Sequence, residues 1–173
     1  MRLFIAINFT DATRSKLHDL QNELHFMSIR GRYTNPDNMH LTLAFLGECD
    51  MEQYSAAITA MAACNFKPFD IWFYNVGRFR RDGGDIWWVG LHDSNQLTSL
   101  HLDLTYHLAS VGFELERRRF SPHVTIGREV YTHEKPWQVE AFKEPVSSID
   151  LMKSERINGK MVYTIIASAP ENG

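Results

Sequence analysis

Apolar and polar residues alternate in two short segments of the chain that share one pattern. Residues 40–43 read His-Leu-Thr-Leu, and residues 123–126 read His-Val-Thr-Ile. Successive side chains of a β-strand point to opposite faces, so the histidine and threonine of each motif share one face and the apolar residues occupy the other. Both motifs therefore predict strands that bury one face and present an imidazole beside a hydroxyl on the other.

The rest of the pattern predicts further strands and three helices. Apolar and β-branched runs predict strands over 3–8, 39–46, 69–76, 86–91, 119–128, 146–152 and 161–169. Apolar residues at helical spacing, preceded by capping residues, predict helices around 17–27, over 51–64 and over about 96–111. Residues 32–34 are expected to end a strand, residues 36–38 to form a turn, and Gly83-Gly84 to form the tip of a hairpin.

The two motifs begin at His40 and His123, about half the chain apart, and each half has a similar order of elements. A chain of 173 residues fits one domain, residues 1–173. We expect an α+β fold of two pseudo-symmetric lobes, each a mainly antiparallel sheet with helices outside. The two histidines would then face each other across a central groove.

The repetition of the motif is what makes it informative. A bare His-x-Thr is expected about 0.5 times by chance in a chain of this composition, and the apolar flanks lower that to roughly 0.1. Two copies are expected in fewer than about 1 in 100 such chains. One motif alone carries no functional information, whereas the pair indicates a shared site.

Histidine and threonine in this arrangement suit the cleavage of a phosphodiester. An imidazole with a pKa of about 6.5 can accept a proton from water or donate one to a leaving oxygen at neutral pH. The hydroxyls of Thr42 and Thr125 can donate to the non-bridging phosphate oxygens as charge develops. For a strained 2′,3′-cyclic phosphate, this chemistry does not require a metal.

Two other interpretations of the histidines compete with this one. A single histidine is more often a hydrogen-bonded structural residue, which is what we expect at positions 18, 25, 92, 101, 107 and 133. A zinc hydrolase is the second alternative, because histidine is a common metal ligand. The sequence contains no His-Glu-x-x-His and no His-x-His, and no acidic residue adjoins either motif, so no metal site is expected.

Composition narrows the range of partners, metal sites and cellular locations that the chain can have. A net charge of −3 argues against broad binding of duplex nucleic acid, but it leaves room for a nucleotide or an RNA end. Cys49 and Cys64 are isolated, so neither a zinc cluster nor a disulfide framework is expected. The apolar run at residues 3–7 is too short for a signal peptide or a membrane span. We therefore expect a cytoplasmic protein that does not bind membranes.

Arginines surround the second motif and are the candidate phosphate-binding residues. Three consecutive arginines, ending with Arg118 and Arg119, precede it, and Arg128 follows it. Arginine suits a clamp on phosphate because its guanidinium donates in a fixed fork. Strict alternation places Arg119 on the face of His123 and the other two on the opposite face, unless the proline before the histidine introduces a bulge.

A second basic segment, residues 77–84, lies at the predicted hairpin tip. It either follows an RNA backbone, with Phe79 or Trp87 stacking on a base, or is simply solvated. One ring of Trp87 and Trp88 is expected to face the core and the other the groove or solvent. By its parity with the apolar residues of the first motif, Phe45 is expected in the core.

These residues give the chain a resemblance to a known family. It resembles the 2H phosphoesterases, which are named for two His-x-Thr-x motifs, and within them the RNA 2′,3′-cyclic phosphodiesterases, also called 2′-5′ RNA ligases. Both motifs are present with their flanks. The matching segments are residues 1–6, 38–47, 88–90, 118–128, 151–154 and 163–164.

The resemblance implies a bilobal fold and a reaction that uses neither metal nor ATP, nor any other cofactor. It implies hydrolysis of an RNA terminal 2′,3′-cyclic phosphate to a 2′-phosphate, with reversible 2′-5′ joining of tRNA halves as a side activity. By the same resemblance, His40 donates a proton to the departing 3′ oxygen and His123 activates water, while Thr42 and Thr125 hold the phosphate. Arg118 matches the family's arginine, although the next residue is Arg where relatives often have Pro.

Two alternative functions stay open. The chain could be a module that binds a nucleotide or RNA end without catalysis. It could also apply the same chemistry to another substrate, such as a 2′-5′ oligonucleotide or a cyclic phosphate on ADP-ribose. The partners expected are RNA 3′ ends or 2′,3′-cyclic nucleotides, and the protein is expected to be a monomer.

Overall fold

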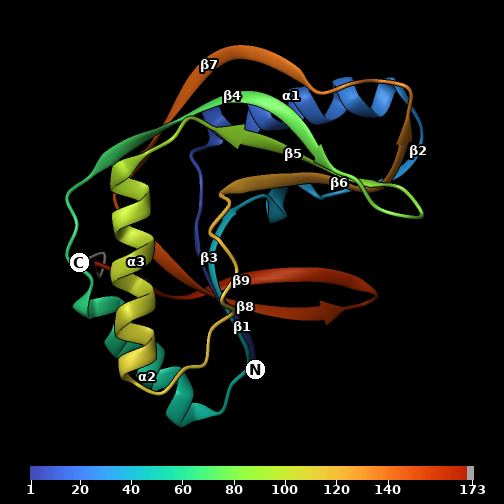
Figure 1. Cartoon of the computed structure of the whole chain (residues 1–173). Coiled ribbons are helices and arrows are strands. Elements are labelled where there is room, and N and C mark those ends of the chain that lie inside the picture. Colours follow the sequence, from blue (N-terminus) through green and yellow to red (C-terminus); the bar gives the residue numbers. More distant parts are fainter. Residues whose placement is uncertain (171–173) are drawn as a thin grey trace.

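A computed structural model describes residues 1–170, which form two antiparallel sheets and three α-helices (Figure 1). The strands are β1 (Arg2–Ile7), β2 (Ser28–Tyr33), β3 (Leu41–Glu48), β4 (Phe69–Phe79), β5 (Asp85–Leu91), β6 (His123–Thr132), β7 (Trp137–Val146), β8 (Ile149–Ile157) and β9 (Lys160–Ala169). The helices are α1 (Asp11–Phe26), α2 (Met51–Ala63) and α3 (Asn95–Ser110), with a 3₁₀ turn, η1, at Pro36–Asn38.

The two sheets are the two lobes, and each lobe contains one motif. The four-stranded sheet has the order β3-β1-β8-β9, and the five-stranded sheet has the order β2-β6-β5-β4-β7. The prediction of an α+β fold with two antiparallel lobes is therefore confirmed. Neither lobe is one half of the chain, however, because β8 and β9 complete the first sheet, whereas β2, β4 and β5 belong to the second.

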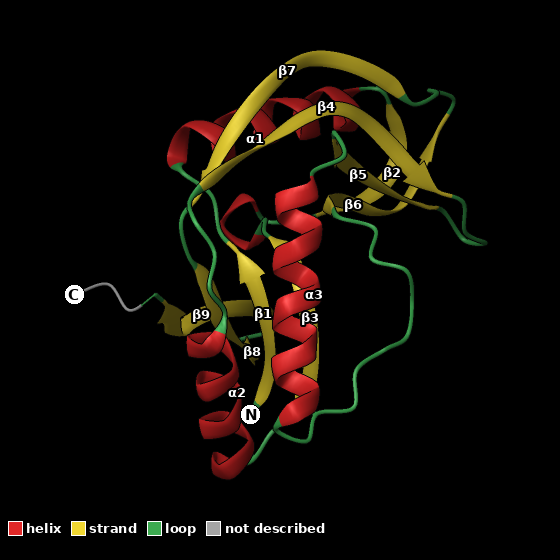
Figure 2. Ribbon diagram, turned by 60° about the vertical axis from the view of Figure 1, so that its left-hand side comes forward, coloured by secondary structure: helices red, strands yellow, loops and turns green. Residues whose placement is uncertain are grey.

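The helices cover the two sheets separately. Helix α1 packs on the five-stranded sheet through β2, β6 and β7, whereas α2 packs on β8 and β9 and against α3 (Figures 1 and 2). Each helix begins at a capping side chain: Thr10, Asp50 and Ser94 each accept a backbone N–H of the first helical turn, so of the two candidates for α1, Thr10 and Asp11, the cap is Thr10. A single cluster of buried side chains contains residues of both sheets and all three helices.

A buried carboxylate fixes α1 to the edge of the five-stranded sheet. Glu144 of β7 is almost inaccessible to solvent and accepts from the backbone N–H of Thr10 at 2.9 Å and from its hydroxyl at 3.0 Å. A negative charge is favourable at a helix N-terminus, where backbone N–H groups lack partners within the helix. Burial of Glu144 therefore positions the start of α1 against the sheet.

Three strands differ from the sequence prediction. The strand predicted over 119–128 begins only at His123, because the preceding segment is an extended loop. Residues 146–152, which were predicted as one strand, contain the last residue of β7, a two-residue connection and the start of β8. Most of β7 was not predicted, because it is an edge strand whose exposed face is polar and which tolerates Pro145.

Within residues 1–170, no helix combines the length and the apolar character that a membrane crossing requires.

Candidate active site

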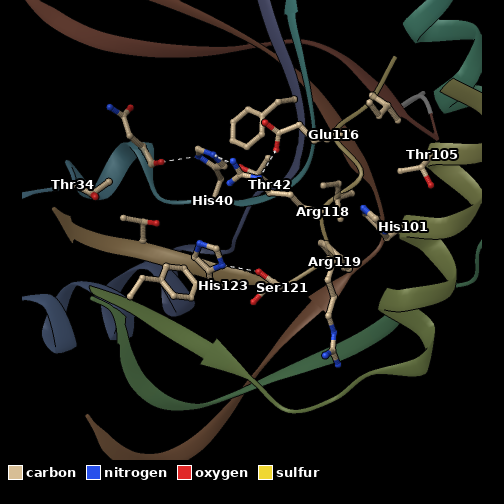
Figure 3. Close-up of a pocket in the computed structure, with 18 of the residues that line it drawn as sticks. Thr34, His40, Thr42, His101, Thr105, Glu116, Arg118, Arg119, Ser121 and His123 are labelled. Atoms are coloured by element: carbon tan, nitrogen blue, oxygen red, sulfur yellow. Dashed lines mark hydrogen bonds and ion pairs between the residues drawn. The ribbon is translucent and has the colours of Figure 1, made fainter. Parts of the chain in front are cut away.

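A cavity of about 660 Å³ lies between the lobes and brings the two motifs together. His40, immediately before β3, and Thr42, within it, line one side, and His123 and Thr125 line it from the start of β6 (Figure 3). The apolar residues of both motifs, at positions 41, 43, 124 and 126, are buried in the core. Alternation predicted this division correctly for both strands.

Both ring nitrogens of His40 have hydrogen-bond partners. Nδ1 lies 2.8 Å from the carbonyl oxygen of Asn38, and Nε2 lies 2.9 Å from the hydroxyl oxygen of Thr42. Because a carbonyl only accepts, Nδ1 carries the proton of the neutral ring and Nε2 accepts from the hydroxyl. Nε2 is therefore the nitrogen of His40 that can exchange a proton with a ligand in the cavity.

The surroundings of His40 favour its neutral form. Burial lowers its pKa from 6.5 to about 4; the hydrogen bond to Asn38 opposes this shift, and the positive charge of Arg14 adds to it. The ring packs between aromatic side chains, with its centroid 4.8 Å from that of Phe4 and 5.2 Å from that of Tyr163. An anion beside Nε2 would act against these effects and raise the pKa.

His123 is held in the same way but has different neighbours. Its Nδ1 donates to the carbonyl of Ser121 at 2.6 Å, which leaves Nε2 as the basic nitrogen. Burial lowers its pKa, the bond to Ser121 opposes the shift, and Arg128 adds to it. The ring packs edge-on against Phe79, with 5.1 Å between centroids, and lies 6.1 Å from the ring of Trp88.

The prediction that Phe45 belongs to the core is wrong. Its side chain is 67% exposed and lines the cavity. Between β1 and β3 the register passes from Ile5 opposite Ala44 to Ala6 opposite Thr42, so β3 contains one extra residue. This bulge buries both Leu43 and Ala44 and turns Phe45 to the histidine face. Two-residue alternation cannot predict a bulge, which depends on the pairing with β1.

The tryptophan pair divides as predicted, but the stacking role considered for Trp87 is excluded. The side chain of Trp87 is fully buried, whereas Trp88 is half-buried and lies against Phe79 and His123. The ring of Trp88 occupies space that a Cβ atom at Gly77 would fill. Phe79 lines the cavity, so of the two candidate stacking residues only this one can reach a base.

All three candidate arginines line the cavity, which corrects the alternation argument. Arg118 and Arg119 lie in the loop before β6, where strand parity does not apply. Arg128 lies at a bulge of β6, next to Glu129 at a φ of 53°. In Figure 3 the side chain of Arg118 points toward Thr42 and forms an ion pair with Glu116 at 3.6 Å, whereas Arg119 extends away from both histidines.

Helix α1 supports both motifs from behind. The Arg14 side chain donates to the carbonyls of Pro36 at 2.9 Å and Met39 at 3.2 Å, immediately before His40. The buried amide of Gln21 donates to the carbonyl of Thr34 at 2.6 Å and to that of Ile126, in the second motif, at 2.9 Å. One helix thus fixes both the segment that leads into β3 and the backbone of β6, which belong to different sheets.

Several residues of the cavity wall were not singled out from the sequence as site candidates. They are polar or aromatic residues outside the motifs: Thr34, His101, Thr105, Glu116 and Tyr163. His101 stacks on Phe120 with parallel rings 3.8 Å apart and so joins α3 to the arginine-bearing loop. The helical spacing of His101 and Thr105, one turn apart, was the available signal for a second polar wall.

No group of three or more His, Cys, Asp or Glu side chains within residues 1–170 is placed to hold a metal ion.

The site and fold together define a two-lobed α+β protein with paired His-x-Thr motifs facing one cavity. The sequence model of the 2′-5′ RNA ligase superfamily matches residues 12–155. The chain belongs to this superfamily.

Two curated relatives that share one name match this chain over nearly three quarters of their own length. The chain is 33% identical to the RNA 2′,3′-cyclic phosphodiesterase of Archaeoglobus fulgidus over 129 residues, which cover 74% of this chain and 72% of that protein. It is 31% identical to the RNA 2′,3′-cyclic phosphodiesterase of Thermotoga maritima over 141 residues, which cover 80% and 74%.

Solved structures have the same fold. The apo form of LigT from E. coli superposes with a TM-score of 0.85 at 26% identity, covering 96% of this chain and 95% of that one. LigT complexed with 3′-AMP superposes with a TM-score of 0.84 at the same identity and coverage.

Proposed function

We propose that this protein hydrolyses the terminal 2′,3′-cyclic phosphodiester of RNA to a 2′-phosphomonoester, without a metal ion. The observation that carries the proposal is the matched placement of His40 and His123. Each ring donates through Nδ1 to a backbone carbonyl and lines the same cavity from a different lobe. Two imidazoles fixed in this way can act as one acid and one base.

In the proposed reaction, Nε2 of His123 accepts a proton from water as the water oxygen attacks phosphorus. The bond from phosphorus to the 3′ oxygen breaks, and Nε2 of His40 donates a proton to that oxygen. The product retains its phosphate on the 2′ oxygen. The reaction leaves His40 neutral, as it is in the free protein, and after product release His123 returns its proton to solvent, so both residues regain their starting states.

The negative charge that develops on the phosphate needs donors in the cavity. The hydroxyls of Thr42 and Thr125 lie on the histidine face of each strand, and we assign them to the non-bridging oxygens. We assign the charge compensation to Arg118, because its side chain points toward the first motif (Figure 3). These neutral and cationic donors supply the stabilisation that a metal ion provides in other phosphodiesterases.

The lowered pKa of His40 must be reversed for it to act as the acid. In the free protein this ring is neutral near pH 7, because burial lowers its pKa to about 4. A cyclic phosphate carries a negative charge, and an opposite charge within hydrogen-bonding distance stabilises the imidazolium. Substrate binding therefore protonates His40, which makes the acid available only when there is a leaving group to protonate.

The same site can join two RNA ends. If the 5′ hydroxyl of a second RNA replaces water, its oxygen attacks phosphorus, the 3′ oxygen leaves, and a 2′-5′ linkage forms. We propose this reversible activity, with tRNA halves as substrates, because the chain belongs to the 2′-5′ RNA ligase superfamily. The complex of LigT with 3′-AMP supports a nucleotide as the group bound in the cavity. We further propose that the chain acts in the cytoplasm as a monomer, a single domain of two lobes.

The proposal is tested by incubating the purified protein with adenosine 2′,3′-cyclic monophosphate in excess EDTA and separating the products. Adenosine 2′-monophosphate is expected. Formation of the 3′-monophosphate would contradict the leaving-group assignment. Activity that vanished with EDTA and returned with zinc would contradict metal independence, and binding without turnover would indicate a non-catalytic module.

A further inference from the structure

A second hollow, of about 580 Å³, adjoins the cavity at the tip of the β4–β5 hairpin. It lies between residues 78–85 of the hairpin and Val130 to Thr132 of β6, and Figure 1 shows this tip projecting beyond the five-stranded sheet. We call this hollow the hairpin groove. Arg81 lines both the cavity and the groove, so the two are neighbours at this residue.

The groove is basic although the chain as a whole is acidic, with a net charge of −3. Three arginines line it (78, 80 and 81) together with two aspartates (82 and 85). Asp85 lies 3.9 Å from the Nε of Arg78 and 3.8 Å from that of Arg80, so one carboxylate is shared by two guanidinium groups. The side chain of Arg78 is 19% exposed, whereas that of Arg80 is 75% exposed and can reach a ligand.

An aromatic ring lies beside these charges. Tyr131 lines the groove, and the guanidinium of Arg30 stacks over its ring at 4.1 Å. Arg81 lies over the ring of Phe79, which lines the cavity, at 5.6 Å. Guanidinium groups for phosphates and flat rings for bases are the features by which proteins bind single-stranded nucleic acid.

We propose that the hairpin groove binds the single-stranded RNA that continues in the 5′ direction from the cyclic phosphate. The inference rests on the proposed function, because it takes the cavity as the site of the RNA end. The RNA strand that leads away from the cyclic phosphate passes Arg81, and the nucleotides that follow contact Arg80 and Tyr131. The groove is too small an area of positive charge to hold a duplex on a chain of net charge −3, which favours a single strand.

The test compares a short substrate with a long one. Adenosine 2′,3′-cyclic monophosphate fills the cavity alone, whereas an eight-nucleotide RNA ending in a 2′,3′-cyclic phosphate also reaches the groove. Arg80→Ala and Tyr131→Ala are each expected to lower kcat/KM for the RNA by about fivefold to tenfold, through KM, and to leave that for the mononucleotide unchanged. Arg156→Ala, at an exposed arginine near the β8–β9 turn, is the matched control and should change neither.

Two further measurements sharpen the test: the salt dependence of RNA binding, and the effect of a variant that removes a negative charge from the groove. Arg80→Ala should reduce the slope of log K against log salt concentration for the RNA by about 0.7, the contribution of one contact to a single-stranded phosphate. Asp82→Asn removes a competing negative charge and should tighten RNA binding. Two results would overturn the proposal. One is an equal loss of kcat/KM for the RNA and for the mononucleotide, and the other is an unchanged kcat/KM for the RNA in Arg80→Ala and Tyr131→Ala.

Binding separates this proposal from the proposed function. If the native protein hydrolyses neither substrate, the proposed function fails, and the groove is then tested by fluorescence anisotropy with a labelled eight-nucleotide RNA. Weaker binding in Arg80→Ala than in Arg156→Ala supports the groove, and equal binding overturns it. Displacement of that RNA by polyglutamate at equal concentration would also overturn it, since the surface would then be specific for anions in general and not for RNA.

Discussion

The two motifs of this protein have the same design but lie in different surroundings. The first begins an edge strand of the four-stranded sheet, and the second begins an inner strand of the five-stranded sheet. Nε2 of His40 is hydrogen-bonded to the hydroxyl of Thr42, and the imidazole ring packs against Phe4 and Tyr163. His123 packs instead against Phe79 and Trp88. Two tetrapeptides of the same pattern therefore place two imidazoles on one cavity, and the neighbouring residues determine the proton affinity of each ring.

The difference between the histidines bears on their roles. His40 lies close enough to Arg14 for that charge to lower its pKa, and Arg128 has the same influence on His123. The larger shift falls on His40, which is the proposed acid and so depends on the substrate for its proton. A symmetric pair of motifs can carry out an asymmetric reaction because the two rings have different surroundings.

Loss of either imidazole should have the largest effect. His40→Ala and His123→Ala are each expected to lower kcat by about 10²- to 10⁴-fold, the usual contribution of general acid or base catalysis. The double variant should be little slower than the slower single one, because acid and base act in one step. Initial rates with a 2′,3′-cyclic nucleotide give the values, and circular dichroism checks the fold. Full activity in either single variant would contradict the paired mechanism.

The threonines should have the next largest effect and distinguish the two motifs. Thr42→Val and Thr125→Val keep the branched shape and remove the hydroxyl. A lost hydrogen bond to a charged group corresponds to about 10- to 100-fold in kcat. Thr42→Val should in addition raise the pKa of His40 in the free protein, because the donor to the basic nitrogen is gone, and NMR titration measures this. Threonine-to-serine variants at the two positions serve as controls and should retain most of the activity.

Arginine substitutions should resolve which guanidinium contacts the phosphate. We expect Arg118→Ala to reduce kcat/KM about tenfold, since it removes one charge-assisted hydrogen bond. Arg119→Ala should change it less than about threefold, because its side chain extends away from the histidines (Figure 3). Steady-state kinetics on the cyclic mononucleotide decide between them. The reverse order would assign the phosphate to Arg119.

The smallest expected effect is a shift of the pH profile. Burial lowers the pKa of both rings, so kcat/KM, which reports the free protein, should follow a bell with its maximum below pH 6.5. The kcat profile should lie at higher pH, because the bound anion raises both pKa values. Arg14→Met removes a positive charge near His40, so its pKa should rise and the acidic limb of kcat/KM should move to higher pH. A flat profile from about pH 5 to 9 would contradict acid–base catalysis by histidine.

The site was predictable from the sequence where it depends on local alternation. The faces of His40, Thr42, His123 and Thr125 follow from strand geometry alone, since neither motif contains an irregularity before its second apolar residue. Phe45 was not predictable, because the bulge that turns it depends on the register with β1. Pairing with a strand that is distant in the sequence cannot be predicted from a window of eight residues.

Elements that depend on their neighbours in space were also harder to predict. The polar outer face of β7 hides it from a search for apolar runs, and its place at a sheet edge becomes clear only from the topology. Similarly, nothing near Arg14 or Gln21 in the sequence indicates that α1 holds the backbone of both motifs. These contacts join segments up to 105 positions apart.

The assignment of acid and base is tested most directly by a substrate that needs no acid. A nucleoside 2′,3′-cyclic phosphorothiolate with sulfur at the 3′ bridging position has a leaving group that departs without protonation. We expect His40→Ala to cleave it at nearly the native rate, whereas His123→Ala remains slow because water still needs a base. The assignment would be contradicted if this substrate restored the cleavage rate of His123→Ala and not that of His40→Ala, or if it restored neither.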